Sequence, residues 1–151
     1  MNAPDEHLAA PDPHFVTRVR ESFGRQKAMA LIGASLTRVA PGEVEIALPW
    51  REDLTQQKGF IHGGILGMIA DTACGYAAFS LMPAGGSLVT VEYKINILKP
   101  GRGSLLARAK VIRPGRTLTV ARAEVYSEDG SHVATMLQTL MALPGTPDTP
   151  E

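Results

Sequence analysis

The segment His62-Gly63-Gly64 is the first place in the sequence where residue types and spacing indicate chemistry. It opens a long apolar run that favours a helix, although alanine in place of either glycine would stabilise that helix by about 1 kcal/mol. Glycines at such a position indicate an unusual backbone angle or the close approach of another group. The first N–H groups of a helix are unpaired and can polarise a bound carbonyl. A tight strand-to-helix turn without any ligand explains the glycines equally well.

Asp71 lies in the middle of the same apolar run. A buried carboxylate without a partner costs several kcal/mol, so this residue needs an explanation. One explanation is chemical, because an aspartate in such a place can serve as a general base or a nucleophile. The other is structural, with Asp71 capping a neighbouring element or facing a wet crevice. Cys74, three residues further on, is expected to be a small core residue.

The spacing of Gly63 and Asp71 indicates a site shared between two chains. The two residues are eight positions apart, which is roughly 12 Å along a helix axis and about 80° around it. One reacting carbonyl cannot lie within ~3 Å of both groups on a single helix. If both act on the same bond, they must come from different subunits of a homodimer.

The elements that would position these residues follow from the apolar pattern. Residues 15–31 have the spacing of an amphipathic helix, and residues 63–82 form the long apolar helix. Alternation of apolar and polar residues predicts about six strands, joined by short Pro-Gly and Asp-Gly turns that are typical of antiparallel neighbours. In the third strand the alternation places Thr90 on the polar face, opposite Val91 and Tyr93. The predicted strands cover residues 34–40, 43–50, 89–97, 105–111, 117–127 and 132–143. The expected fold class is α+β, with one curved antiparallel sheet wrapped round a long central helix.

Composition excludes several classes of function. The 151 residues carry 15 basic and 15 acidic side chains, so no net charge attracts the chain to nucleic acid or to an anionic membrane. A single cysteine excludes a disulfide framework and a cysteine-cluster zinc site. Residues 65–82 approach the minimum length of a membrane span, but the central carboxylate favours a helix buried inside a soluble protein. We expect a cytoplasmic protein with a single domain at residues 13–143, and flexible tails at 1–12 and 144–151.

An ordered set of short segments resembles a known family. It begins with a glutamine-containing stretch at 56–61 that runs into His62-Gly63-Gly64, and Asp71 follows within Ile69-Ala70-Asp71-Thr72-Ala73. It continues through Val89-Thr90-Val91-Glu92-Tyr93, Asn96 and Pro100 to Pro114-Gly115-Arg116-Thr117. Over residues 15–143 the chain is similar to the hotdog-fold acyl-CoA thioesterases of the PaaI (phenylacetate-pathway) type. That resemblance implies a hydrolase that splits a thioester into a free acid and coenzyme A, without a metal or a separate cofactor.

The resemblance also implies a role for each residue of the site. The N–H of Gly63 polarises the thioester carbonyl, and Gln56 orients that carbonyl or a water, with Gln57 as the competing candidate. Asp71 of the partner subunit is the base or nucleophile. Thr90 assists the attacking water, which matters more here because relatives with Glu at the position of Asp71 often carry Ser or Thr where this chain has Gly75. His62 is a further catalytic candidate, although a histidine at a helix entrance more often holds the turn.

Coenzyme A needs a site for its phosphates. Arg113, Arg116 and Thr117 match the nucleotide-contacting hairpin of the family, and Gly64 is assigned to substrate binding beside Gly63. The family also implies a dimer of dimers. An acyl-CoA binding or sensing protein without catalysis is the alternative function on the same fold, and a hotdog dehydratase is a weaker third. Small residues along the helix suit an aryl or medium-chain acyl group, and the choice between them stays open; they are Ala70, Ala73, Gly75 and Ala77.

Overall fold

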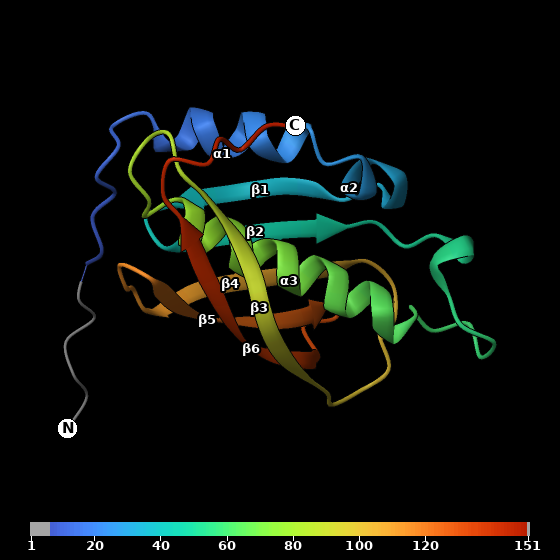
Figure 1. The fold of residues 1–151 in the computed structure, drawn as a ribbon. Helices are drawn as coiled ribbons and strands as arrows, with labels where there is room; N and C mark the ends of the chain where they lie inside the picture. Colours follow the sequence, from blue (N-terminus) through green and yellow to red (C-terminus); the bar gives the residue numbers. More distant parts are fainter. Residues whose placement is uncertain (1–6, 151) are drawn as a thin grey trace, which may run out of the picture.

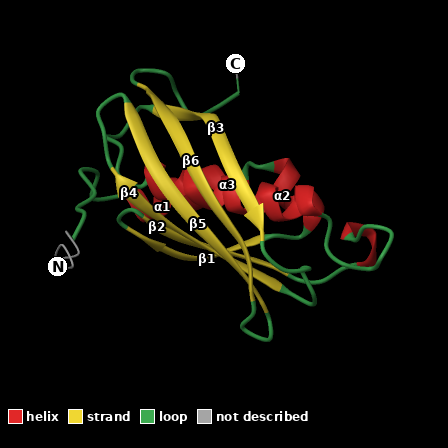
Figure 2. Cartoon of the chain, turned by 90° about the horizontal axis from the view of Figure 1, so that it is seen from below, coloured by secondary structure: helices red, strands yellow, loops and turns green. Residues whose placement is uncertain are grey.

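The computed structural model describes residues 7–150, which form a six-stranded antiparallel sheet that curves round one long helix (Figure 1, Figure 2). The strand order β1-β2-β4-β5-β6-β3 leaves β1 and β3 as the two edges. This architecture confirms the predicted fold. The elements in chain order are α1 (Phe15–Gly24), α2 (Lys27–Ile32), β1 (Ser35–Ala40), β2 (Glu43–Leu48), a 3₁₀ turn (Glu52–Leu54), α3 (Gly63–Phe79), β3 (Ser87–Ile97), β4 (Leu105–Arg113), β5 (Leu118–Ser127) and β6 (His132–Leu143).

Helix α3 packs into the concave side of the sheet through small side chains. Ala70, Ala73 and Ala77 are fully buried, which lets the helix backbone approach the strands closely. The sheet contributes alternate residues that are also fully buried, including Ile46 of β2 and Ala123 of β5. Among residues 7–150, no helix is both long enough and apolar enough to cross a membrane. Within the apolar run at 63–82, most residues from Leu66 to Phe79 are buried and form the centre of the core.

The amphipathic segment predicted as one helix over 15–31 is two helices. The chain leaves the helical conformation at Gln26, whose φ of −74° and ψ of 95° are extended, so α1 and α2 are separate. Helix α2 ends at Gly33, which adopts a left-handed conformation with φ of 76°. The break lets both helices lie on the same side of the molecule as β1 (Figure 1).

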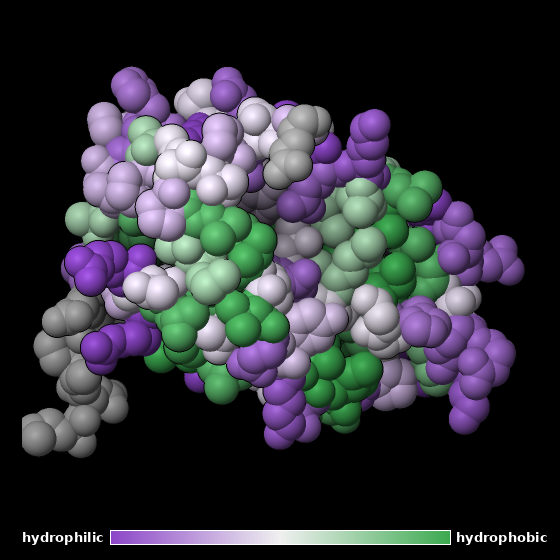
Figure 3. Space-filling view, viewed as in Figure 1, coloured by the Kyte–Doolittle hydropathy of each residue, from purple (hydrophilic) through white to green (hydrophobic). Residues whose placement is uncertain are grey.

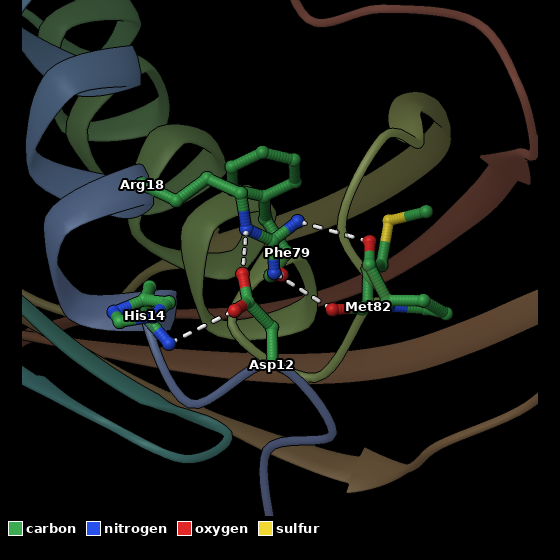
Figure 4. A network of polar contacts seen from close by, with 6 residues as sticks. Asp12, His14, Arg18, Phe79 and Met82 are labelled. Atoms are coloured by element: carbon green, nitrogen blue, oxygen red, sulfur yellow. Dashed lines mark hydrogen bonds and ion pairs between the residues drawn. The ribbon is translucent and has the colours of Figure 1, made fainter.

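Helix α3 ends at Phe79, three residues before the predicted end, and Arg18 of α1 holds that end (Figure 4). Its guanidinium donates to the carbonyl oxygens of Met82 at 2.7 Å and Phe79 at 3.3 Å, where a helix leaves carbonyls unpaired. Asp12 pairs with the Arg18 Nε at 2.9 Å and accepts from the backbone N–H of His14 at 2.8 Å. Residues 7–12 thus include a buried side chain that is anchored to α3.

Strand β3 contains an extra residue that changes which side chains face the helix. Thr90 lies opposite Leu140 and Glu92 lies opposite Thr139, so Val91 is a bulge without a partner in the ladder. The strict alternation predicted from the sequence is wrong here. Thr90 turns toward α3, as does Tyr93 beyond the bulge, whereas the expected alternation placed these two residues on opposite faces. The bulge is what brings the Thr90 hydroxyl to the helix.

Candidate active site

The start of α3 offers one free backbone donor. His62 is the N-cap, and its Nδ1 accepts from the Gly64 N–H at 2.9 Å. Within residues 7–150, the Gly63 N–H has no hydrogen-bond acceptor. Of the two glycines, Gly63 is therefore the one that can donate to a ligand, while the Gly64 N–H is already engaged. The histidine ring secures the helix start, as a histidine at this place usually does.

Gly63 and Gln56 line the same pocket, which has a volume of about 330 Å³ and also includes Ile97 and Lys99. A Cβ on Gly63 would lie 2.8 Å from Ile97 Cδ1, so a larger residue here would have to displace the end of the Ile97 side chain. Gln57 is exposed and is absent from the lining, so of the two glutamines only Gln56 borders this pocket, and its Oε1 accepts from the Lys58 N–H. His62 is likewise absent from the lining, and its direct role in catalysis stays a prediction.

Asp71 is half-buried and has two partners from the sheet. Thr90 Oγ1 donates to Asp71 Oδ1 at 2.8 Å, and Gln138 Nε2 donates to the same oxygen at 2.7 Å. The same Gln138 nitrogen lies 2.9 Å from Thr90 Oγ1. The sequence suggested a carboxylate in purely apolar surroundings. The structure instead shows one that accepts hydrogen bonds from β3 and β6.

Gln138 is a site residue that the sequence analysis missed. It is fully buried and follows Ala134 and Met136 on the inward face of β6, where every second residue is apolar. A glutamine in the apolar phase of a buried strand is the signal that could have identified it, because a buried amide needs hydrogen-bond partners.

Asp71 and Thr90 open onto a second pocket of about 160 Å³ that Gly75 and Tyr76 also line. The Tyr76 hydroxyl lies 3.0 Å from Ser22 Oγ, and burial raises the pKa of this tyrosine. The C-terminal segment reaches the same pocket, because Asp148 accepts from Ser22 and pairs with Arg25 of α1 at 3.0 Å. Of the four small helix residues expected to leave room for an acyl group, Gly75 faces this pocket, whereas Ala70, Ala73 and Ala77 are buried in the core.

The structure does not bring all the predicted residues together within one chain. Gly63 and Asp71 line different pockets, as the eight-residue spacing predicted. Arg113, Arg116 and Thr117 are exposed at the β4–β5 hairpin. Arg116 borders an apolar pocket of about 530 Å³ beside the α3–β3 loop, at the end of the molecule where α3 finishes (Figure 1). Gly63 lies at the opposite end of the helix.

Cys74 supplies no reactive group to this site, and the described residues form no cluster of metal ligands. Cys74 is fully buried, and burial together with the nearby Asp71 charge raises the pKa of its thiol. It is therefore an unreactive core residue. Within residues 7–150, no group of three or more His, Cys, Asp or Glu side chains could hold a metal ion.

Comparison with known proteins identifies the family to which this chain belongs. A thioesterase family protein from Silicibacter pomeroyi is 49% identical, with a TM-score of 0.84 over 87% of this chain and 99% of its own. The Escherichia coli PaaI protein, from the phenylacetic acid degradation operon, is 22% identical and shares the fold, with a TM-score of 0.81 over 87% of this chain and 95% of its own. The architecture is thus that of the hotdog proteins. Residues 58–134 match the thioesterase superfamily, and the chain belongs to that superfamily.

A curated relative covers a smaller part of the chain. A protein of Halobacterium salinarum whose name describes it as an esterase is 34% identical to this chain over 88 residues, which is 55% of this chain. The chain spans 58% of the length of that relative.

Proposed function

We propose that this protein hydrolyses an acyl-CoA thioester to a free acid and coenzyme A. The observation that carries the proposal is the carboxylate of Asp71, held by Thr90 and Gln138 beside an open pocket, on the helix whose first residue has a free N–H. A donor for a developing oxyanion and a base or nucleophile are the two groups that acyl transfer needs.

We further propose that the working site lies between two subunits. Within one chain Gly63 and Asp71 line separate pockets, so a second chain must supply one of them. Strand β3 is an edge with exposed apolar residues, including Val91 at 53% exposure and Ile97 at 51%. Figure 3 shows apolar surface gathered around β3 and α3 on this face. Two copies joined antiparallel along β3 would place Asp71 of one against Gly63 of the other.

In the proposed reaction, the groups of the two subunits act one after another. The Gly63 N–H of one subunit polarises the thioester carbonyl, and the Gln56 amide orients it. Asp71 of the other subunit then attacks the carbonyl carbon, or takes a proton from a water that attacks it, with Thr90 holding the water. The tetrahedral intermediate collapses, the C–S bond breaks and coenzyme A leaves as a thiolate. If Asp71 is the nucleophile, water hydrolyses the resulting anhydride in a second step, and both routes give the same products.

The β4–β5 hairpin is proposed to bind the phosphates of coenzyme A through Arg113, Arg116 and Thr117. In one chain this hairpin lies at the far end from Gly63, so a further copy must bring it close to the thioester. A two-fold axis perpendicular to β3 reverses the direction of the second chain and so brings its hairpin end toward the Gly63 end of the first. Pairing of dimers into tetramers belongs to the same proposal.

Thiol release from a panel of aryl and medium-chain acyl-CoAs tests the function. We expect turnover by the wild type, and a loss of about 10²- to 10⁴-fold in kcat for Asp71→Asn, the range for removing a catalytic acid–base group. Asp129→Asn, which removes an exposed turn carboxylate, is the control and should match the wild type. Binding of acyl-CoA without turnover by the wild type would instead support the sensing protein. A stable and active monomer in light scattering would refute the shared site.

A further inference from the structure

Gln138 contacts the carboxylate of Asp71, and the reaction described above gives it no role. Its side chain is fully buried on β6, and its amide nitrogen lies 2.7 Å from Asp71 Oδ1 and 2.9 Å from Thr90 Oγ1. A side-chain amide carries two N–H groups, so it can donate one to each oxygen. We propose that Gln138 is a positioning residue that fixes the carboxylate so that Oδ2 is its reacting oxygen; this inference rests on the proposed thioesterase function.

The two carboxylate oxygens of Asp71 have different surroundings. Oδ1 accepts from both Thr90 and Gln138. Oδ2 accepts from no side chain or backbone group of residues 7–150, and Asp71 lines the open pocket. Lone pairs that already accept hydrogen bonds are poor bases and poor nucleophiles. Oδ2 is therefore the atom that can attack a carbonyl or take a proton from water.

The orientation of the Gln138 amide depends on the ionised state of Asp71. Its Oε1 is buried and has no hydrogen-bond partner among the described residues. If the amide were reversed, Oε1 would point at Asp71 Oδ1, and two oxygens without a proton between them repel each other. The orientation in the structure instead directs N–H groups at the carboxylate. Gln138 thus acts only as a hydrogen-bond donor toward Asp71.

A purely structural role does not account for this glutamine. A buried carbonyl oxygen without a partner destabilises the fold. Its inward-facing neighbours on β6, Met136 and Leu140, are apolar and almost fully buried, so an apolar side chain suits the position. Replacement of Gln138 by methionine removes the unpaired Oε1 together with one hydrogen bond to Asp71, so it should change stability little while activity falls.

Few other titratable groups face this site. Tyr76 and Asp148 line the same pocket, and Cys74 lies one turn further along α3. Burial raises the pKa of both Tyr76 and Cys74, so neither changes its charge in acid. Glu92 and Lys94 of β3 pair with outward-facing residues of β6, on the other face of the sheet. Asp148 is therefore the carboxyl group that a control must address.

The experiment measures kcat, KM and the pH dependence of kcat/KM for Gln138→Met and Gln138→Glu. Loss of the donated hydrogen bond in Gln138→Met should lower kcat by about tenfold or more with little change in KM. It should also move the acidic limb of the profile of kcat/KM against pH upward by about one pH unit. Gln138→Glu places a second carboxyl beside Asp71 and should move the acidic limb further in the same direction. Met136→Leu, a buried neighbour on the same face, and Asp148→Asn should both keep the wild-type acidic limb.

A wild-type acidic limb in Gln138→Met would overturn the proposal, as would a loss of thermal stability that alone accounts for the fall in kcat. If the wild type hydrolyses no acyl-CoA, the proposed function fails, but the positioning of Asp71 can still be measured. NMR titration of the Asp71 carboxyl carbon, assigned with Asp71→Asn, reports the same protonation without turnover. An upward move of the midpoint in Gln138→Met supports the role of Gln138, and an unchanged midpoint refutes it.

Discussion

Replacement of Thr90 by valine tests whether its hydroxyl serves the carboxylate. Valine keeps the shape of threonine and removes the group that donates to Asp71 Oδ1 at 2.8 Å. A hydrogen bond to a charged group contributes about 1.5–3 kcal/mol, and the exposure of Thr90 in the single chain favours a smaller value of about 1–2 kcal/mol. If that energy is lost in the transition state, kcat/KM falls by about 5- to 30-fold.

Thiol release with a chromogenic disulfide measures this change, and two further variants make it specific. Thr90→Ser keeps the hydroxyl and should retain most of the activity. Thr90→Val combined with Gln138→Met should lose less than the product of the two single losses, because both residues act on one oxygen. Wild-type kcat/KM in Thr90→Val would refute the reasoning, and so would strictly multiplicative losses in the double variant.

Three further outcomes follow from the structure. Val91→Lys places a charge on the exposed β3 edge, and it should dissociate the dimer in light scattering and abolish turnover of acyl-CoA. The control Leu31→Lys changes a residue of α2 with 75% exposure and should leave both the dimer and the turnover unchanged. Arg18→Met removes the ion-pair partner of the buried Asp12 carboxylate and the donor to the Met82 carbonyl, and should lower the free energy of unfolding in urea by about 3 kcal/mol; unchanged unfolding would contradict the role of Arg18. Cys74 should not react with the chromogenic disulfide until the protein unfolds, because it is fully buried; rapid labelling of the native protein would contradict that burial.

Most of the fold could be predicted because its signals are local. Alternation predicted strands at 43–50 and 132–143, of which β6 has the predicted bounds and β2 ends two residues earlier at Leu48, and Gly-containing turns mark the hairpins. The break between α1 and α2 was missed because Gln26 is an ordinary helix former, although Gly24 at the end of α1 is a local signal for it. The end of α3 was missed for a similar reason. Arg18, 61 residues before Phe79, takes up the carbonyls there, and no local pattern encodes that contact.

The candidate site was predictable only in part. Gly63 and Asp71 stand out because each conflicts with its local setting, a helix start in one case and an apolar run in the other. The placement of Thr90 depends on the bulge at Val91, and a period of two cannot show where an extra residue enters a strand. Gln138 was missed because one polar residue barely alters the alternating apolar pattern from which a strand is predicted.

The two features that sequence reasoning missed explain how an apolar helix can carry a half-buried carboxylate. The helix packs closely against the sheet through Ala70, Ala73 and Ala77, and no α3 side chain of the described residues donates to the Asp71 carboxylate. The donors must then come from the strands beside it. Strand β6 supplies an amide from its buried face, and β3 supplies a hydroxyl because its bulge turns Thr90 inward. Both donors meet Oδ1, so the same contacts that make the charge tolerable leave Oδ2 open to the pocket.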